Sequence, residues 1–373
     1  MNVVNKKWNY KKLGDVCTVE RGGSPRPIDD YITDNPAGIN WIKIGDTNDE
    51  SMFITQTAQK ILPEGMKKSR YVRPGDFLLS NSMSFGRPYI LKIDGCIHDG
   101  WLVLRDKENV FDKRFLYYYL SSKPTYQKFK MMAVGGVVNN LNSEMVRGVD
   151  VPIPGKDEQV KIADVLDKIS RIIAYKKKEL VKSDDLIKAR FVEMFGDLRV
   201  NPFGFKKKKL KDTCIVITGN TPSRSVPEYY GDYMEWIKTD NIVTGFLNPT
   251  KSVEYLSEAG VNVGRTVEKD SILMACIAGS VTSIGRVCIT DRKVAFNQQI
   301  NAVIPKEYDV LFLYVMLQMS KDYLTEEINM ALKGILSKSK LEEKEFIIPP
   351  IKQQKQFATF VTQVDKSKFS KIA

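Results

Sequence analysis

The sequence predicts an α+β protein in which two similar globular α/β domains are separated by long antiparallel helices. The first observation is an internal repeat, because segments of the first half of the 373-residue chain recur in order at offsets of 195 to 197 residues. The second is the stretch from Asp157 to about Phe195, which contains no Gly or Pro and has apolar residues at helical spacing. A duplicated unit of domain plus helix predicts a pair related by a pseudo-twofold axis.

Pairs of short segments carry the repeat. A single match would be chance, but this many matches in the same order indicate a duplication. The period is far longer than the ~20–50 residues of a solenoid repeat, so each copy is a domain with its connector. The pairs are Lys12–Cys17 with Lys209–Cys214, Gly22–Pro25 with Gly219–Pro222, Trp41–Lys43 with Trp236–Lys238, Phe115–Tyr117 with Phe312–Tyr314, Val151–Pro154 with Phe346–Pro349, and Gln159–Ala163 with Gln354–Ala358.

Each copy begins with a β-rich part, in which short apolar runs alternate with Gly, Pro, Asn and Asp. Phe77–Ser80 and Ile272–Ala275 are predicted strands of this part. Short helices are predicted at Phe115–Leu120 and Leu311–Met319, followed by extended exits that end at Pro154 and Pro350. The predicted organisation is a first target-binding domain at 1–155, a central long helix at 156–196, a second such domain at 197–350 and a short C-terminal helix at 351–373.

The central helix carries an apolar seam along one face, which Lys176 and Ser183 interrupt. At about 1.5 Å per residue, ~39 residues span roughly 58 Å, and a stripe of that length needs a partner helix. The seam consists of Ile162, Leu166, Ile169, Ile173, Leu180, Ile187, Phe191 and Met194.

The second copy supplies the partner, with Phe357, Phe360, Val361 and Val364 on one face. It ends early, because residue 373 corresponds to residue 178 (373 − 195), so counterparts of residues 179–195 are missing. If the distal half of the central helix lacked a partner for this reason, we would expect exposed Ile187 and Phe191 to drive self-association.

The charge balance favours a polyanionic partner. Lys and Arg number 57 and Asp and Glu 45, which gives a net charge of +12, and the simplest polyanion is DNA. His98 is the one histidine, and the five cysteines form no C-x-x-C pair, so a metal site has little support. The first residues lack a signal peptide, and the longest apolar run, Val310–Leu317, is too short to span a bilayer. We therefore expect a cytoplasmic protein with reduced thiols and no membrane segment.

The motifs of an enzyme are missing. A methyltransferase would need a glycine-rich cofactor loop and a D/N-P-P-Y/F tetrad, and the nearest string, Asn201–Gly204, lacks the second proline. The chain has no G-x-x-x-x-G-K-S/T phosphate-binding loop. Glu342, Glu343 and Lys344 could belong to a nuclease, but a solvated charged face explains them better. The sequence therefore predicts a protein without catalysis.

Two related basic domains on a rigid spacer suit a DNA target in two parts. Dimeric DNA-binding proteins contact half-sites at a spacing that their symmetry dictates. Because both copies lie in one chain, they can differ, which predicts an asymmetric bipartite site. The alternative is a duplicated protein-interaction scaffold that binds DNA only nonspecifically.

The order of motifs resembles the specificity (S) subunit of type I restriction-modification systems, the HsdS family, over essentially the whole chain. The pattern W-x4-L-G-D-V from Trp8 to Val16 resembles the start of a target-recognition domain in that family. The remaining motifs are the Gly22–Pro25 and Gly219–Pro222 turns, the Trp41–Lys43 and Trp236–Lys238 elements, the central helix end at Phe191–Asp197 and the C-terminal helix at Asp365–Lys368.

The resemblance implies a role in a complex. An S subunit binds double-stranded DNA at a bipartite sequence and carries no catalysis or cofactor. Two methyltransferase (M) subunits, which hold S-adenosylmethionine, dock on its helices, which also act as the spacer. Motor-nuclease (R) subunits, which use ATP and Mg²⁺, complete the complex. The short second helix departs from the family pattern and puts the fit of one M subunit in question.

Candidate DNA-binding residues follow from base and phosphate chemistry. Arg and Lys suit guanine and phosphate, Asn and Gln suit adenine, and Ser and Thr adapt to either. An ordinary hairpin loop would also explain residues 81–87, buried amide pairing would explain 297–299, and solvation would explain the lysine run 206–209. The first-domain candidates are Ser24, Arg26, Lys43, Asn81, Ser82, Ser84 and Arg87. The second-domain candidates are Thr221, Ser223, Arg224, Lys238, Ser280, Thr282, Ser283, Arg286, Asn297, Gln298 and Gln299.

Overall fold

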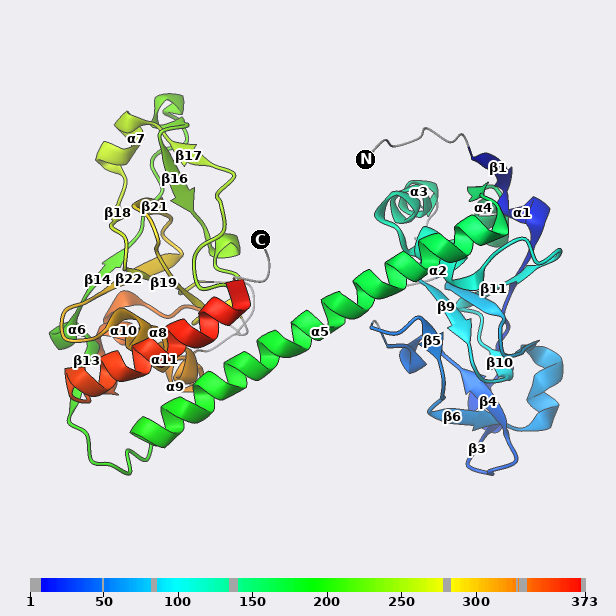
Figure 1. Cartoon of the computed structure of the whole chain (residues 1–373), viewed down its shortest axis with the longest axis horizontal. Helices are drawn as coiled ribbons and strands as arrows, with labels where there is room; N and C mark the ends of the chain where they lie inside the picture. The colour runs from blue at the N-terminus through cyan, green and yellow to red at the C-terminus, as the bar shows by residue number, and fades with distance from the viewer. Residues whose placement is uncertain are drawn as a thin grey trace. The chain divides into compact units, whose positions relative to one another are not determined.

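The computed structural model describes residues 8–48, 50–81, 86–133, 140–277, 283–326, 328 and 334–369, with side chains as far as residue 364 (Figure 1). The chain divides into two compact units between Ile173 and Ala174. This division falls inside one continuous helix, α5 (Lys156–Phe195). Each unit has its own sheets and its own hydrophobic core.

The described part of the first unit contains two five-stranded sheets, β2-β11-β8-β9-β5 and β3-β6-β4-β10-β7, and the pair β1-β12. Strand β11 lies between β2 and β8, so Leu104 is opposite both Val19 and Phe77. In the second sheet β10 runs parallel to β4, with Cys96 opposite Trp41. The elements are β1 Asn9–Lys12, α1 Leu13–Val16, β2 Cys17–Arg21, η1 Ile28–Asp30, β3 Ile32–Thr33, β4 Ile39–Ile42, η2 Ile44–Asp46, β5 Phe53–Ile54, β6 Gln59–Ile61, η3 Pro63–Lys68, β7 Arg70–Val72, β8 Phe77–Ser80, β9 Pro88–Leu91, β10 Gly95–Ile97, β11 Trp101–Asp106, α2 Lys113–Ser121, α3 Lys123–Ala133, α4 Ser143–Arg147 and β12 Asp150–Ile153.

The second unit repeats this topology in its described residues, with the sheets β14-β22-β19-β20 and β15-β17-β16-β21-β18 and the pair β13-β23. Strand β22 lies between β14 and β19, and Val303 is opposite both Val216 and Ile272. Strand β21 runs parallel to β16, with Ala295 opposite Trp236. The elements are β13 Lys207–Lys209, α6 Leu210–Thr213, β14 Cys214–Thr218, η4 Pro227–Tyr229, β15 Tyr230–Gly231, β16 Met234–Ile237, η5 Thr239–Asn241, β17 Tyr255–Leu256, α7 Glu258–Val263, β18 Thr266–Val267, β19 Ile272–Ala275, β20 Val287–Ile289, β21 Val294–Phe296, β22 Ile300–Pro305, α8 Val310–Met319, α9 Lys321–Thr325, α10 Lys338–Glu343, β23 Glu345–Ile347 and α11 Ile351–Phe369.

The internal repeat is therefore confirmed in three dimensions. The predicted strands Phe77–Ser80 and Ile272–Ala275 are β8 and β19. The predicted short helices are α2 and α8, and both begin at an aspartate N-cap that accepts hydrogen bonds from backbone amides of the first turn. Asp112 caps α2, and Asp309 caps α8.

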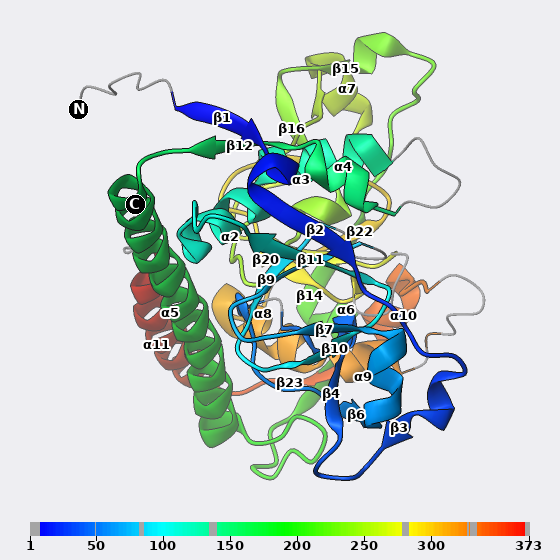
Figure 2. The same ribbon diagram turned by 90° about the vertical axis from the view of Figure 1, so that its right-hand side faces the viewer.

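Helices α5 and α11 pack against each other in the second unit (Figures 1 and 2). The ring centroids of Phe191 and Phe195 lie 5.4 and 5.6 Å from that of Phe357. Farther back along α5, Arg190 lies against Phe360, at 5.9 Å from its ring centroid. Contact positions therefore rise along α11 as they fall along α5, and this part of the helix pair is antiparallel, as predicted.

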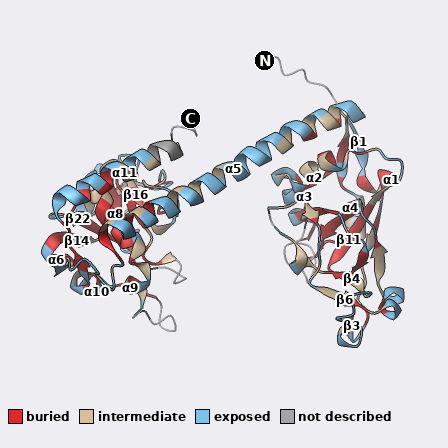
Figure 3. Ribbon diagram, turned by 60° about the horizontal axis from the view of Figure 1, so that its bottom comes forward, coloured by how far each residue is buried: buried red, intermediate tan, exposed pale blue. Residues whose placement is uncertain are grey.

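The seam of α5 is covered only at its two ends. Ile162 packs against the core of the first unit, and Ile187 and Phe191 are buried in the core of the second. Ile169 and Ile173, in the middle, are exposed. Figure 3 shows that most of the middle of α5 is coloured as exposed. The expectation that Ile187 and Phe191 would be exposed was wrong. Both side chains are buried in the core of the second unit, to which the first turns of α11 contribute.

Candidate nucleic-acid interface

Three of the first-unit candidates contact Asp99, at the turn between β10 and β11. Ser24 donates a hydrogen bond from Oγ to Oδ1 of Asp99 at 2.8 Å, and Nη2 of Arg26 lies 3.5 Å from Oδ2. The amide Nδ2 of Asn81 donates to the backbone carbonyl of Asp99 at 2.9 Å. Two segments that are distant in sequence, one with Ser24 and Arg26 and one with Asn81, therefore converge on this turn. Burial opposes ionisation, but the hydrogen bond from Ser24 lowers the pKa of Asp99.

Lys43 joins this turn through its neighbour Ile44. The backbone amide of Ile44 donates to Nε2 of His98 at 3.1 Å. Burial lowers the pKa of His98, so its neutral, accepting form is favoured. The ammonium of Lys43 donates to Oε1 of Gln59 at 2.7 Å, which leaves the lysine charge without an acidic partner in this contact.

Close approach of the backbone explains the first glycine of each turn motif, Gly22 and Gly219. A Cβ at Gly22 would overlap the carbonyl oxygen of His98. A Cβ at Gly219 would overlap the carbonyl oxygen of Asn297 in the same way. The glycine of each motif therefore lets its loop lie against the turn that carries the site.

The second unit builds the same convergence from equivalent segments. Thr221 donates from its hydroxyl to the amide oxygen of Gln298, at the places of Ser24 and Asp99 in the first unit. The backbone amide of Asn297 donates to the carbonyl of Ile237 at 3.0 Å, which ties the turn to the end of β16. Arg286 donates to the carbonyl of Thr239 at 3.2 Å. Hydrogen bonds therefore join four segments of this unit, which carry Thr221, Thr239, Arg286 and Gln298.

A cluster of charged and aromatic residues stands beside this turn, and we call Arg224, Tyr230, Trp236, Lys238 and Glu254 the Arg224 cluster. Nη2 of Arg224 lies 2.5 Å from Oε2 of Glu254, and Lys238 is paired with Oε1. The guanidinium carbon of Arg224 lies 4.3 Å from the ring centroid of Tyr230 and 5.2 Å from that of Trp236. Hydrogen bonds from Lys238 and Arg224 lower the pKa of Glu254, so its carboxylate is ionised.

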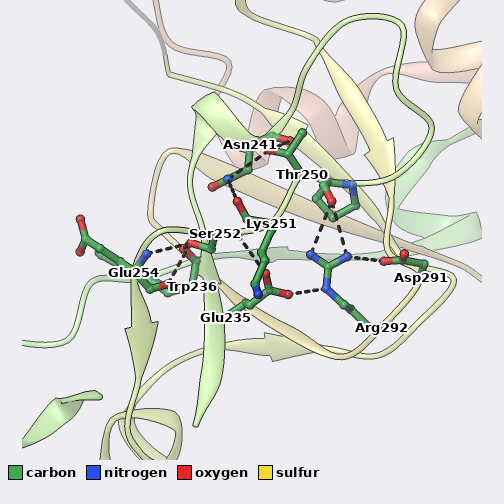
Figure 4. A network of polar contacts seen from close by, with 10 residues as sticks. Glu235, Trp236, Asn241, Thr250, Lys251, Ser252, Glu254, Asp291 and Arg292 are labelled. Atoms are coloured by element: carbon green, nitrogen blue, oxygen red, sulfur yellow. Dashed lines mark hydrogen bonds and ion pairs between the residues drawn. The ribbon is translucent and has the colours of Figure 1, made fainter. Parts of the chain in front are cut away.

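A polar network joins β16 to residues 250–254, the segments that carry Trp236 and Glu254 of this cluster (Figure 4). Oγ of Ser252 lies 2.8 Å from the carbonyl oxygens of both Trp236 and Glu254. The backbone amide of Ser252 donates to Oε1 of Glu235 at 2.9 Å, and the other oxygen of Glu235 accepts from Arg292. The network thus fixes the backbone at Trp236 and at Glu254.

The remaining predicted residues differ in accessibility. Asn81 and Asn297 are buried, and their amides hold the turns through hydrogen bonds to Asp99 and Gln299. Arg26, Arg87, Thr221, Ser223, Arg224 and Gln298 are exposed, and Ser24, Lys43, Lys238, Ser283, Arg286 and Gln299 are half-buried. Ser82, Ser84, Ser280 and Thr282 lie outside the described residues.

Sequence reasoning missed the acceptors of the site, Asp99, Gln59 and Glu254, because it searched for groups that contact DNA directly. The repeat contained a usable signal, since Gln59 and Glu254 stand at the offset of 195 that also joins Lys43 to Lys238.

The other charged stretches are taken up by ion pairs. Lys208 pairs with Glu307 and Lys209 with Glu343, both at 2.7 Å. These ion pairs favour the interpretation of the lysine run as a solvated charge cluster. Among the described residues, no group of three or more His, Cys, Asp or Glu side chains is placed to hold a metal ion. Within the same part of the chain, no helix has the length and apolar character needed to cross a membrane.

Comparison with known proteins places both repeats in one family. The family model for the type I restriction modification DNA specificity domain matches residues 5–182 and 202–372. The chain is 24% identical over 400 residues to the type I restriction enzyme MjaIX specificity subunit of Methanocaldococcus jannaschii, covering 93% of this chain and 84% of the relative. It is 24% identical over 391 residues to the HindI specificity subunit of Haemophilus influenzae, covering 83% and 82%.

The fold is similar to that of solved structures. The crystal structure of a type I restriction-modification S subunit from M. genitalium matches with a TM-score of 0.58 at 13% identity, over 99% of this chain and 92% of that one. A chain from a structural study of type I complex assembly and conformational transition matches with a TM-score of 0.53 at 14% identity, over 99% and 93%.

Proposed function

The chain belongs to the type I restriction-modification DNA specificity family, and from this premise we propose that each of its two units reads one half of a bipartite, asymmetric DNA site. As the specificity subunit, it is a non-catalytic member of the type I complex, whose cofactors reside on the M and R subunits. The proposal concerns how this subunit recognises its target.

The duplicated turn is the observation that carries the proposal. The contact of Ser24 with Asp99 recurs as the contact of Thr221 with Gln298, between the loop that follows the equivalent strands β2 and β14 and the turn that precedes β11 and β22. Both turns present hydroxyl, amide and cationic groups, which are the groups that contact base edges and phosphates. The residues at equivalent places differ between the units, and this difference supports two different half-sites.

The net charge of +12 supports the same target, since a basic surplus gives sequence-independent attraction to the phosphate backbone. Side-chain contacts at the two turns would then add the sequence preference. Because the proposed target is cellular DNA, the proposed location of the protein is the cytoplasm.

The helices form the second part of the proposal, as spacer and as docking surface for two M subunits, with R subunits joining through the complex. Helix α5 exposes Val165, Ile172, Tyr175 and Val181, which are large apolar side chains along its middle. Exposed apolar patches on a protein often mark interaction surfaces.

Selection from random-sequence DNA tests the proposed target. The full chain, assembled with its M subunits, is incubated with a random duplex pool, and the retained DNA is sequenced. We expect two fixed blocks of different sequence separated by a gap of fixed length. A pool without enriched sequence would support the interaction scaffold instead, and one uninterrupted block would contradict the division between two units.

A further inference from the structure

Arg224 is held in place by three neighbours and remains accessible. Its guanidinium faces the rings of Tyr230 and Trp236, and Nη2 bonds to Glu254. The side chain is nevertheless 57% exposed. A guanidinium carries five N–H donors, so the bond to Glu254 leaves donors for a ligand.

The supports of Arg224 are themselves fixed by its own loop. The hydroxyl of Tyr230 donates to the carbonyl of Pro222 at 2.6 Å, and the indole N–H of Trp236 donates to the carbonyl of Asn220 at 3.3 Å. The loop that carries Arg224 is thereby fastened to the two rings over which its guanidinium lies. Little conformational entropy remains for Arg224 to lose when a ligand binds.

This arrangement suits a base better than a phosphate. Guanine presents N7 and O6 as two acceptors in one plane, and a fixed guanidinium plane can meet both. A phosphate anchor gains mainly from net positive charge, but Glu254 reduces the formal charge of the Arg224–Lys238 pair from +2 to +1. The carboxylate thus weakens phosphate attraction and keeps the donor geometry.

The equivalent positions in the described part of the first unit carry other residues. Gln59 stands at the place of Glu254, at the offset of 195, and Lys43 donates to its neutral amide. Ile32, opposite Ile61 in the sheet, takes the place of Tyr230, which is opposite Leu256. An effect of the Arg224 cluster must therefore be confined to one half of the target.

We infer that Arg224 reads a guanine in the half-site of the second unit, and that Glu254 is a positioning residue that fixes the guanidinium plane for this contact. The inference rests on the proposed function, because it needs a second unit that reads DNA. It names guanine as the base that is recognised and Arg224 and Glu254 as the residues that select it.

Four variants and a control test the inference in the full chain assembled with its M subunits. They are Arg224→Ala, Arg224→Lys, Glu254→Gln, the Arg224→Ala/Glu254→Gln double variant and the control Glu268→Gln. The control makes the same charge change in an exposed ion pair with Lys293, which lies outside the Arg224 cluster. Each protein is checked by thermal unfolding, and its affinity is measured for the enriched site and for copies in which each guanine is replaced in turn.

We expect Arg224→Ala to lose about a 5- to 150-fold preference for guanine at one position of one half-site. Arg224→Lys should lose most of it, because an ammonium lacks the planar fork. Glu254→Gln should relax the same position, the double variant should be no worse than Arg224→Ala alone, and Glu268→Gln should keep the preference.

Other results would overturn the inference. Equal weakening on all sequences, with the salt slope reduced by about one, would make Arg224 a phosphate contact. Stronger binding of Glu254→Gln to every sequence would make Glu254 only a neutralising charge. An enriched second half-site without guanine would also exclude the assignment. These outcomes differ from failure of the proposed function, in which the unaltered complex enriches no sequence at all.

Discussion

The amide oxygen Oε1 of Gln354 accepts a hydrogen bond from the backbone N–H of Asp309, with 2.9 Å between the two atoms. The Nε2 of the same side chain donates to the carbonyl of Pro349 at 2.8 Å. This one buried residue therefore joins the start of α11, the exit after β23 and the cap of α8. Gln159 makes the equivalent bond to Asp112 at 2.8 Å in the first unit. The duplicated glutamine therefore fixes α5 to the first domain and α11 to the second.

Removing this amide should destabilise the second unit. We expect Gln354→Ala to lower the free energy of unfolding by about 1–3 kcal/mol, because the half-buried N–H of Asp309 and the buried carbonyl of Pro349 lose their partner. The neighbouring Gln353 is exposed, so Gln353→Ala is the matched control and should change stability by less than about 0.5 kcal/mol. Urea unfolding measures both, and equal effects of the two variants would contradict the role assigned to Gln354.

The contact between α5 and α11 should be strong at its aromatic core. Phe191 is fully buried, and its ring centroid lies 5.4 Å from that of Phe357 on α11 and 5.5 Å from that of Phe312 on α8, so we expect Phe191→Ala to cost about 3–5 kcal/mol. Ile173→Ala, on the same helix at 52% exposure, should cost less than about 0.5 kcal/mol. Chemical denaturation compares them. A small effect at Phe191 would show that α11 does not cover this end of α5.

His98 should make stability depend on pH. Burial lowers the pKa of His98 below its ordinary value of 6.5, so below that pH the unfolded chain binds more protons than the folded chain. The stabilisation is complete above pH 6.5 and is lost as the pH falls through this value toward the lower folded pKa. Protonation also removes the acceptor for the amide of Ile44, which costs about 1 kcal/mol.

The matched variant for this prediction is His98→Asn, because Asn297 stands at the equivalent place in the second unit. Thermal unfolding at about pH 7.5 and about pH 5.5 should show a fall in melting temperature for the unaltered chain and a smaller fall for the variant. His98 is the only histidine of the chain, which keeps the comparison simple. The same fall in both proteins would show that His98 is not the group responsible.

Lys43 should contribute more to salt-dependent DNA binding than Lys238 does. Its partner Gln59 is neutral, whereas Lys238 is paired with ionised Glu254. We expect Gln59→Glu to neutralise Lys43 and to reduce the slope of log affinity against log salt by about one. Gln127→Glu makes the same charge change on the exposed face of α3 and should leave the slope nearly unchanged. Equal slopes for the two variants would remove Lys43 from the phosphate contacts.

The repeat made much of the architecture predictable. Strands Phe77–Ser80 and Ile272–Ala275 are apolar runs next to turn residues, so their bounds were predicted correctly. The helix that ends at Phe195 was predictable because its apolar spacing persists without Gly or Pro. Two-residue strands such as Ile32–Thr33 were not, since their pairing with distant strands decides their conformation and leaves no local pattern.

The site was less predictable than the fold. Donors such as Ser24 and Arg224 could be chosen by residue type, but burial decides what an amide does, and Asn297 is buried within its turn. The acidic partners Asp99 and Glu254 were missed, because an acid beside a DNA-binding group looks unfavourable until the geometry shows that it holds a cation or a hydroxyl in place.

Exchanging residues 1–155 for the same part of another specificity subunit tests whether each unit reads its own half of the target. The chimaera is assembled with its M subunits, and the methylated positions in genomic DNA are sequenced. We expect one half of the methylated motif to change to that of the donor subunit, while the other half stays as in the unaltered complex. A change in both halves together, or in neither, would contradict it.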